Sequence, residues 1–169
     1  MKNLIVIFIV MLCSCTNSQV RNNLSTTEYN AIKINNINWR QINNTKANIA
    51  QMKTLFGNNI TIKTATEPSL MISFWEKKLG FYFRFEENNP NLSNDYILYY
   101  FRILNLKSNI TIKGKTITIG SNISDLGNVL INTNDFNIVY GTENTDDILM
   151  VKFNPTTNLI TNIEYTLFN

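Results

Sequence analysis

The sequence predicts an α+β fold built from two tandem units, each a β-hairpin followed by a helix and three strands. Three observations support this prediction. In residues 109–130, alternating hydrophobicity gives way to helical spacing. Residues 31–56 repeat the same plan roughly 75 residues earlier, and three strand-like segments follow each copy. We therefore expect an antiparallel sheet with short helices packed on one face, either as one continuous sheet or as two packed halves.

Residues 109–130 have the pattern of a hairpin that leads into a helix. The apolar positions that alternate with polar residues around the turn at Lys113-Gly114 are Ile110, Ile112, Ile117 and Ile119. Helical spacing follows at Ile123, Leu126 and Leu130. Either Ser121 or Asn122 is suited to cap this helix, and Gly127 weakens it. We expect a short helix stabilised by packing.

Residues 31–56 predict a second hairpin and helix. Ile32 and Ile34 precede an Asn35-Asn36 turn, and Trp39 is expected on the returning strand. Thr45 is the expected cap of a helix over residues 49–56, whose apolar spacing matches that of residues 123–130.

Three strand candidates follow each helix in matching order. The paired segments are 60–67 with 136–143, 70–74 with 149–153, and 81–85 with 163–167. Residues 96–106, rich in aromatic and β-branched side chains, are expected to close the sheet of the first copy. The first unit then covers residues 31–106 and the second 107–169. Chance alignment within an Ile- and Asn-rich chain is the alternative.

The N-terminus predicts a processed and lipidated leader. A positive charge at Lys2 precedes the apolar run of residues 4–12, which is too short for a stable membrane span. The sequence Leu12-Cys13-Ser14-Cys15 resembles the bacterial lipobox, and this resemblance implies a signal peptide over residues 1–14 and a lipid on Cys15. The alternative is an ordinary signal peptide with two incidental cysteines.

Residues 15–30 are expected to form the lipidated N-terminus and a flexible tether, because they are polar and aperiodic. Ser25 and Glu28 match a capping box, but no clear helical pattern follows them. No acidic run follows Cys15, and no Asp comes directly after it. By the lipoprotein resemblance, these absences favour the periplasmic face of an outer membrane, with a Gram-positive cell surface as the alternative.

The composition excludes several common classes of catalytic site. The chain has no histidine, which excludes histidine-based zinc sites and Ser-His-Asp relays. The adjacent acids Glu86-Glu87 and Asp146-Asp147 are interpreted as solvated charges beside loops, and Asp146-Asp147 does not match a calcium loop. A net charge of +3 without a basic run gives no indication of nucleic-acid binding. We expect no enzyme activity, no cofactor and no metal.

Strand alternation predicts an open sheet face that could bind a protein. If the apolar positions of the strands within residues 70–85 face the helices, the side chains that alternate with them along each strand project from the opposite face of the sheet. The candidate protein-binding residues are Met71, Trp75, Tyr82, Arg84, Tyr100, Arg102, Met150 and Lys152. Trp, Tyr, Arg and Met are enriched in protein interfaces. The alternative is a face that the rest of the chain covers.

The repeated unit and its open face resemble the β-lactamase inhibitor protein family, in which two α/β copies present an aromatic-rich sheet to an enzyme. Ile119-Gly120-Ser121 also resembles the segment that precedes the helix in SmpA/OmlA-type outer-membrane lipoproteins. Together with the lipobox and the open sheet face, these resemblances lead us to expect a lipid-anchored envelope protein of the inhibitor or immunity type that binds a protein partner. A structural or assembly role is the alternative, and a glycan-acting enzyme that uses Glu87 or Asp147 is a third class.

Overall fold

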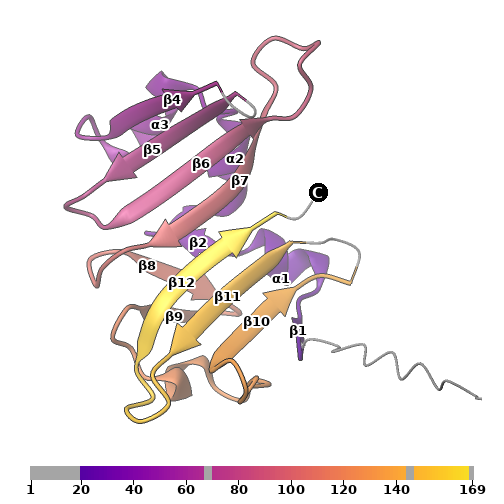
Figure 1. The fold of residues 1–169 in the computed structure, drawn as a ribbon, viewed down its shortest axis with the longest axis vertical. Helices are drawn as coiled ribbons and strands as arrows, with labels where there is room; N and C mark the ends of the chain where they lie inside the picture. Colours follow the sequence, from indigo (N-terminus) through magenta and orange to yellow (C-terminus); the bar gives the residue numbers. More distant parts are fainter. Residues whose placement is uncertain (1–19, 67–69, 144–146, 168–169) are drawn as a thin grey trace, which may run out of the picture.

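The computed structural model describes residues 20–66, 70–143 and 147–167, which form a mixed α+β protein. Its main feature is a large, mostly antiparallel sheet. The helices and a smaller sheet lie behind it in the view of Figure 1, so they cover the same face. The predicted α+β class with short helices on one face of an antiparallel sheet is therefore confirmed at this level.

Strands from both halves of the chain share the large sheet. Its strands, in sheet order, are β1 (Asn22–Asn23), β10 (Asn137–Gly141), β11 (Ile148–Phe153), β12 (Ile160–Thr166), β7 (Tyr96–Ile103), β6 (Phe81–Glu87), β5 (Met71–Glu76) and β4 (Thr61–Ala65). Among the strands that the structure describes in this sheet, only β1 and β10 pair in parallel. β7 pairs with β12, with Ile103 opposite Ile163, and this pairing joins the two halves.

The smaller sheet consists of two hairpins. Its strands, in sheet order, are β3 (Ile37–Asn38), β2 (Lys33–Ile34), β8 (Asn109–Ile112) and β9 (Lys115–Thr118). The central turn residues Asn35 and Asn36 have φ of 50° and 65°, and those of Lys113 and Gly114 are 51° and 75°. Asn and Gly tolerate this left-handed region, which tight hairpin turns require. Both predicted hairpins form, and β2 pairs with β8.

The helical segments are short, and a polar side chain caps each one. They are α1 (Thr26–Asn30), α2 (Trp39–Asn44), α3 (Ile49–Phe56) and the 3₁₀ turn η1 (Ile123–Leu126). The side chains of the N-cap residues Ser25, Asn38, Asn48 and Asn122 each accept a hydrogen bond from a backbone N–H of the first turn. Helices this short depend mainly on tertiary packing for their stability.

A continuous chain of aromatic side chains supplies much of that packing. Phe56 of α3 contacts Phe81 and Phe83 of β6 at ring distances of 4.7 and 5.1 Å. The series continues across the sheet, since Phe83 lies 6.2 Å from Phe101 of β7, which stacks on Tyr165 of β12 at 5.4 Å. It continues through Tyr165 to Trp39 of α2 and from Trp39 to Tyr29 of α1, at 5.3 and 5.0 Å. The inner face of the sheet is thus bound to all three α-helices.

Two local predictions for residues 31–56 are wrong. Trp39 is the first residue of α2 rather than a residue of the returning strand, because Asn38 caps a helix there through the Arg40 backbone N–H. Thr45 is the C-cap of α2, and Asn48 caps α3 instead. The hairpin is consequently shorter than predicted, and an additional helix follows it.

The predicted helix that was to reach Leu130 is only the 3₁₀ turn η1. Gly127 follows Leu126 with φ of 79°, a left-handed conformation that ends the helical backbone. Leu130 is 58% exposed, so it does not contribute to an apolar helix face. Gly127 therefore ends the helix rather than merely weakening it.

The predicted flexible tether over residues 15–30 is wrong from Asn22 onward. β1 pairs with β10, and Ser25 and Glu28 form a complete capping box at the start of α1. Residues 1–19, with the predicted signal peptide and Cys15, lie outside the described residues. None of the helices in the described ranges has the length and hydrophobicity of a transmembrane span.

The division of the sheet into two faces predicts unequal effects of neighbouring substitutions. Phe83→Ala should lower the free energy of unfolding by about 3–5 kcal/mol, because Phe83 is fully buried against Phe56 and Phe101. Tyr82→Ala, one residue away on the other face, should cost at least about 2 kcal/mol less. Urea denaturation of both variants measures the difference, and equal losses would contradict this assignment of faces.

Candidate functional site

The side chains of the large sheet that point away from the helices form its second face. Phe74, Phe83 and Phe101 are at most 2% exposed on the inner face, and their neighbours along each strand project the other way. We call that second surface the outer face. Its defining residues are Lys63, Met71, Ser73, Trp75, Tyr82, Arg84, Glu86, Tyr99, Tyr100, Arg102, Met150, Lys152, Asn162 and Glu164.

All eight candidate protein-binding residues lie on the outer face. Arg102 and Lys152 are exposed, and the other six are half-buried. The strand register places Trp75 beside Tyr82 and Tyr82 beside Arg102. The same row continues through Glu164 to Met150. Residues from positions 75 to 164 therefore form one band across five strands.

An open groove of about 440 Å³ occupies one half of the outer face. The side chains that line it are Lys63, Ser73, Trp75, Tyr82, Tyr100, Arg102 and Leu104. The Tyr82 hydroxyl shares a hydrogen bond of 2.9 Å with Ser73, and its ring meets Tyr100 edge-on at 6.0 Å. The Lys63 ammonium lies 5.8 Å from the centre of the Trp75 ring. These contacts hold the aromatic lining in a defined arrangement.

A β-bulge adds one more aromatic residue to the outer face. Arg84 pairs with Tyr100, whereas Phe85 pairs with Leu98, so Tyr99 is the extra residue on β7. The Arg84 guanidinium lies 4.8 Å from the Tyr99 ring and 5.7 Å from the Tyr100 ring. Cation–π contacts of this kind orient both partners. Tyr99 therefore extends the aromatic surface beside the groove.

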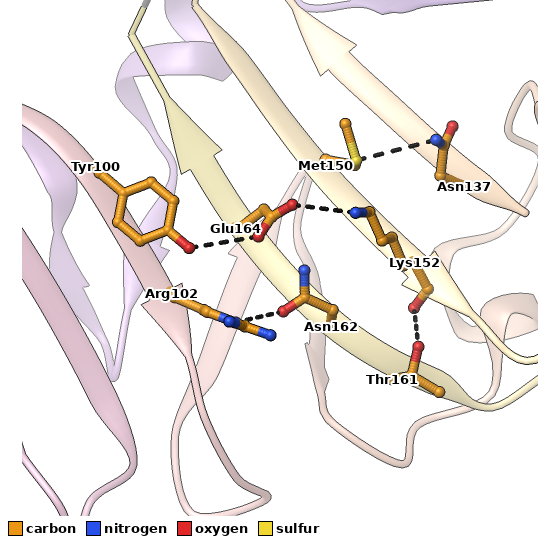
Figure 2. A network of polar contacts seen from close by, with 8 residues as sticks. All are labelled: Tyr100, Arg102, Asn137, Met150, Lys152, Thr161, Asn162 and Glu164. Carbon is orange, nitrogen blue, oxygen red and sulfur yellow. Dashed lines mark hydrogen bonds and ion pairs between the residues drawn. The ribbon is translucent and has the colours of Figure 1, made fainter. Parts of the chain in front are cut away.

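Polar contacts cross the junction between β7 and β12 (Figure 2). Arg102 Nε donates to the Asn162 side chain at 2.7 Å, and the Tyr100 hydroxyl donates to Glu164 at 3.3 Å. Lys152 forms an ion pair with the same carboxylate at 3.4 Å. Side chains of β12 thus orient Tyr100 and Arg102, the two residues that β7 contributes to the groove. Lys152 of β11 in turn orients Glu164.

The protonation states of this network follow from its surroundings. Burial by itself raises the pKa of Glu164, but the Asn162 hydrogen bond and the charges of Lys152 and Arg102 outweigh it. The pKa of Glu164 consequently lies below its usual value. Burial, and then the negative charge of Glu164, raise the pKa of Tyr100. Tyr100 therefore remains a neutral donor to an ionised Glu164 at neutral pH.

Several residues of this surface were not among the binding residues predicted from the sequence. Lys63, Asn162 and Glu164 alternate with the inward residues of β4 and β12, so simple strand alternation could have found them. Tyr99 is different, because it reaches the outer face only through the bulge. Its placement depends on how β6 and β7 pair, which alternation within one strand does not specify.

A second cavity, of about 430 Å³, lies beside Tyr29, Trp39, Asp147 and Tyr165. Asp147 is only 6% exposed, so its interpretation as a solvated loop charge is wrong. Tyr29 donates a hydrogen bond to Asp147 Oδ2 and lies 3.2 Å from the Tyr165 hydroxyl. Burial is the main cause that raises the pKa of both tyrosines. This cluster fastens α1 to β12 and to the start of β11.

The acidic residues in the described part of the chain are dispersed rather than grouped as metal ligands. No group of three His, Cys, Asp or Glu residues there is placed to hold a metal ion. Glu86 forms an ion pair with Arg84 at 3.4 Å. Asp146 lies outside the described residues.

These features describe an α+β protein with helices on one face of its large sheet and an open, aromatic-rich surface on the other. No protein-family model, no curated protein and no solved structure matches the chain.

The Glu164 network predicts a specific dependence of stability on pH. Since the folded-state pKa lies below the unfolded value of about 4.5, this carboxylate stabilises the fold above that pH. The stabilisation is lost as the pH falls through the lower, folded-state pKa. Glu164→Gln should therefore weaken the loss of unfolding free energy between about pH 5 and pH 3.

Urea denaturation at several pH values measures this effect. Asp125→Asn, which removes an exposed carboxyl of η1, is the matched control. A Glu164→Gln variant with the acid sensitivity of the wild type would contradict the proposed role of this network.

Proposed function

We propose that the protein is a non-catalytic binding module that uses its outer face to hold another protein. The observation that carries this proposal is the groove, where Trp75, Tyr82 and Tyr100 stand beside Arg102. Such residues dominate binding energy when they lie near the centre of an interface. The contacts of Tyr82 and Tyr100 with each other and with Ser73 and Glu164 reduce the side-chain entropy that these two tyrosines would lose on binding.

An inhibitor or immunity-type protein is the particular role that we favour. Such a protein needs a rigid surface that blocks its target and needs no reactive group. The outer face meets the first requirement, because residues from five strands hold one another in place. The resemblance to the β-lactamase inhibitor protein family supports the same role by analogy.

A structural or assembly lipoprotein of the outer membrane is the alternative function. Ile119-Gly120-Ser121 supports it through the resemblance to SmpA/OmlA-type lipoproteins. In the structure this segment connects β9 to η1, and the backbone N–H of Gly120 donates to the Ile160 carbonyl at 2.8 Å. The position of this segment before a helical turn supports the alternative by analogy.

We also propose that the fold arose from two tandem units, residues 31–106 and 107–169. The support is the common order of a hairpin, a helical segment and three antiparallel strands in each part. The antiparallel pairing of β2 with β8 places the two hairpins side by side. The units differ in detail, since the first contains α2 and β7 and its α3 is longer than η1.

The proposed location is the periplasmic face of the outer membrane, with a lipid on Cys15 as the anchor. Because β1 begins at Asn22, seven positions after Cys15, the connecting chain is short. Fully extended, it spans at most about 25 Å. The folded part would therefore stay close to the membrane surface and would meet partners that are bound to it or pass beside it.

Affinity capture of the tagged protein from gently solubilised envelopes tests the binding function. We expect one stoichiometric partner, a toxin or hydrolase for the inhibitor role or an outer-membrane barrel for the assembly role. Trp75→Ala and Tyr100→Ala should each weaken its binding by about 30-fold or more, the loss typical of a central interface residue.

Leu92→Ala, an exposed apolar residue in the β6–β7 loop, is the control and should bind like the wild type. Circular dichroism establishes that each variant is folded. Folded Trp75 and Tyr100 variants that bind the partner like the wild type would refute the use of the outer face.

Lipidation is tested separately by Cys15→Ala. This variant should lose labelled fatty acid and membrane association while its folded part is unchanged. Cys13→Ala is the matched control and should retain both, because a small residue is suited to that lipobox position. Membrane association that survives in Cys15→Ala without fatty acid would contradict the proposed anchor.

A further inference from the structure

The charges on the outer face are unbalanced. Its defining residues include four basic side chains, Lys63, Arg84, Arg102 and Lys152, but only the acidic Glu86 and Glu164. Arg84 pairs with Glu86 and Lys152 pairs with Glu164, both at 3.4 Å. Two positive charges therefore remain in excess. Lys63 and Arg102 form no ion pair with any residue that the structure describes.

Both of these cations line the groove. Lys63 comes from β4, at the end of the sheet order, and Arg102 comes from β7, three strands further in. At about 4.8 Å per strand, their backbones are roughly 15 Å apart across the sheet. Trp75, Tyr82 and Tyr100 line the space with them. The groove thus combines an aromatic lining with positive charge from two different strands.

The polar groups of the groove that lack a protein partner are donors. Arg102 uses Nε for Asn162, and its two terminal nitrogens make no hydrogen bond to the described residues. The indole N–H of Trp75 likewise has no acceptor in the described part of the chain, but it is buried and does not face the open groove. Ser73 and Tyr82 bind each other, and Tyr100 donates to Glu164. A ligand with negative charge and acceptor atoms would complement this arrangement.

We infer that the groove between Lys63 and Arg102 binds an acidic segment of the partner protein, with an Asp or Glu side chain directed to the Arg102 guanidinium. This inference rests on the proposed function. Arginine binds carboxylates through two parallel hydrogen bonds, and Asn162 holds Nε so that the terminal nitrogens remain available. Apolar or aromatic residues beside that carboxylate would pack on Trp75, Tyr82 and Tyr100.

Charge complementarity also explains why the segment should be acidic rather than only apolar. A purely apolar segment would cover Lys63 and Arg102 without supplying a counter-charge, which carries a desolvation cost. Association with an acidic segment should be faster at low ionic strength, since surface charges steer encounter and salt screens them.

Selection from a displayed library of random 12-residue peptides on the immobilised full-length chain tests the inference. We expect the selected peptides to contain at least about twice the Asp and Glu content of the input library. The double variant Lys63→Glu/Arg102→Glu should abolish this enrichment. The matched control is Lys33→Glu/Lys115→Glu, which makes the same change in net charge at exposed lysines of the smaller sheet and should keep the enrichment.

The outcomes separate this inference from the function on which it rests. Selected peptides without acidic enrichment, an enrichment that survives charge reversal of the groove, or the absence of selected peptides would each overturn the acidic-segment inference. The binding function itself would still stand if Trp75→Ala and Tyr100→Ala weaken capture of the natural partner. If those variants capture the partner like the wild type, the proposed function fails as well.

Discussion

The chain of aromatic contacts on the inner face is the interaction on which the rest of the structure depends. It runs from Phe56 through β6, β7 and β12 to Trp39 and Tyr29. None of the helices it reaches exceeds eight residues, and helices of that length are unstable in isolation. Burial of the aromatic rings against the sheet therefore stabilises the helices and fixes which face of the sheet is covered.

Because the helices cover only the inner face of the sheet, the outer face remains open to solvent. This asymmetry determines which residues occupy the outer face. Side chains that alternate with the buried phenylalanines must project outward, so these positions can hold aromatic and charged residues that take no part in core packing. Contacts across the strands then hold them, as Tyr82 with Ser73 and Arg102 with Asn162 illustrate. A surface fixed in this way would lose little side-chain entropy on binding a partner, and this small entropy cost is consistent with the proposed binding role.

Two strand pairings join the N-terminal and C-terminal halves of the chain. β7 pairs with β12 in the large sheet, and β2 pairs with β8 in the small one. The pairing of β7 with β12 also places Tyr100 and Arg102 beside Glu164 and Asn162, so the groove depends on residues 64 and 60 positions away in the chain. The buried Asp147 cluster adds a third link, from α1 to the C-terminal strand.

Much of this architecture was determined by the sequence itself, wherever short-range patterns carry the information. Asn35-Asn36 and Lys113-Gly114 encode tight turns because Asn and Gly tolerate left-handed backbone, and alternation in β5 and β6 assigns the two faces. The tertiary structure alone decided the pairing partners, the bulge that adds Tyr99, and the burial of Asp147. These features arise from contacts between distant segments, and no local propensity records which strand will lie beside another.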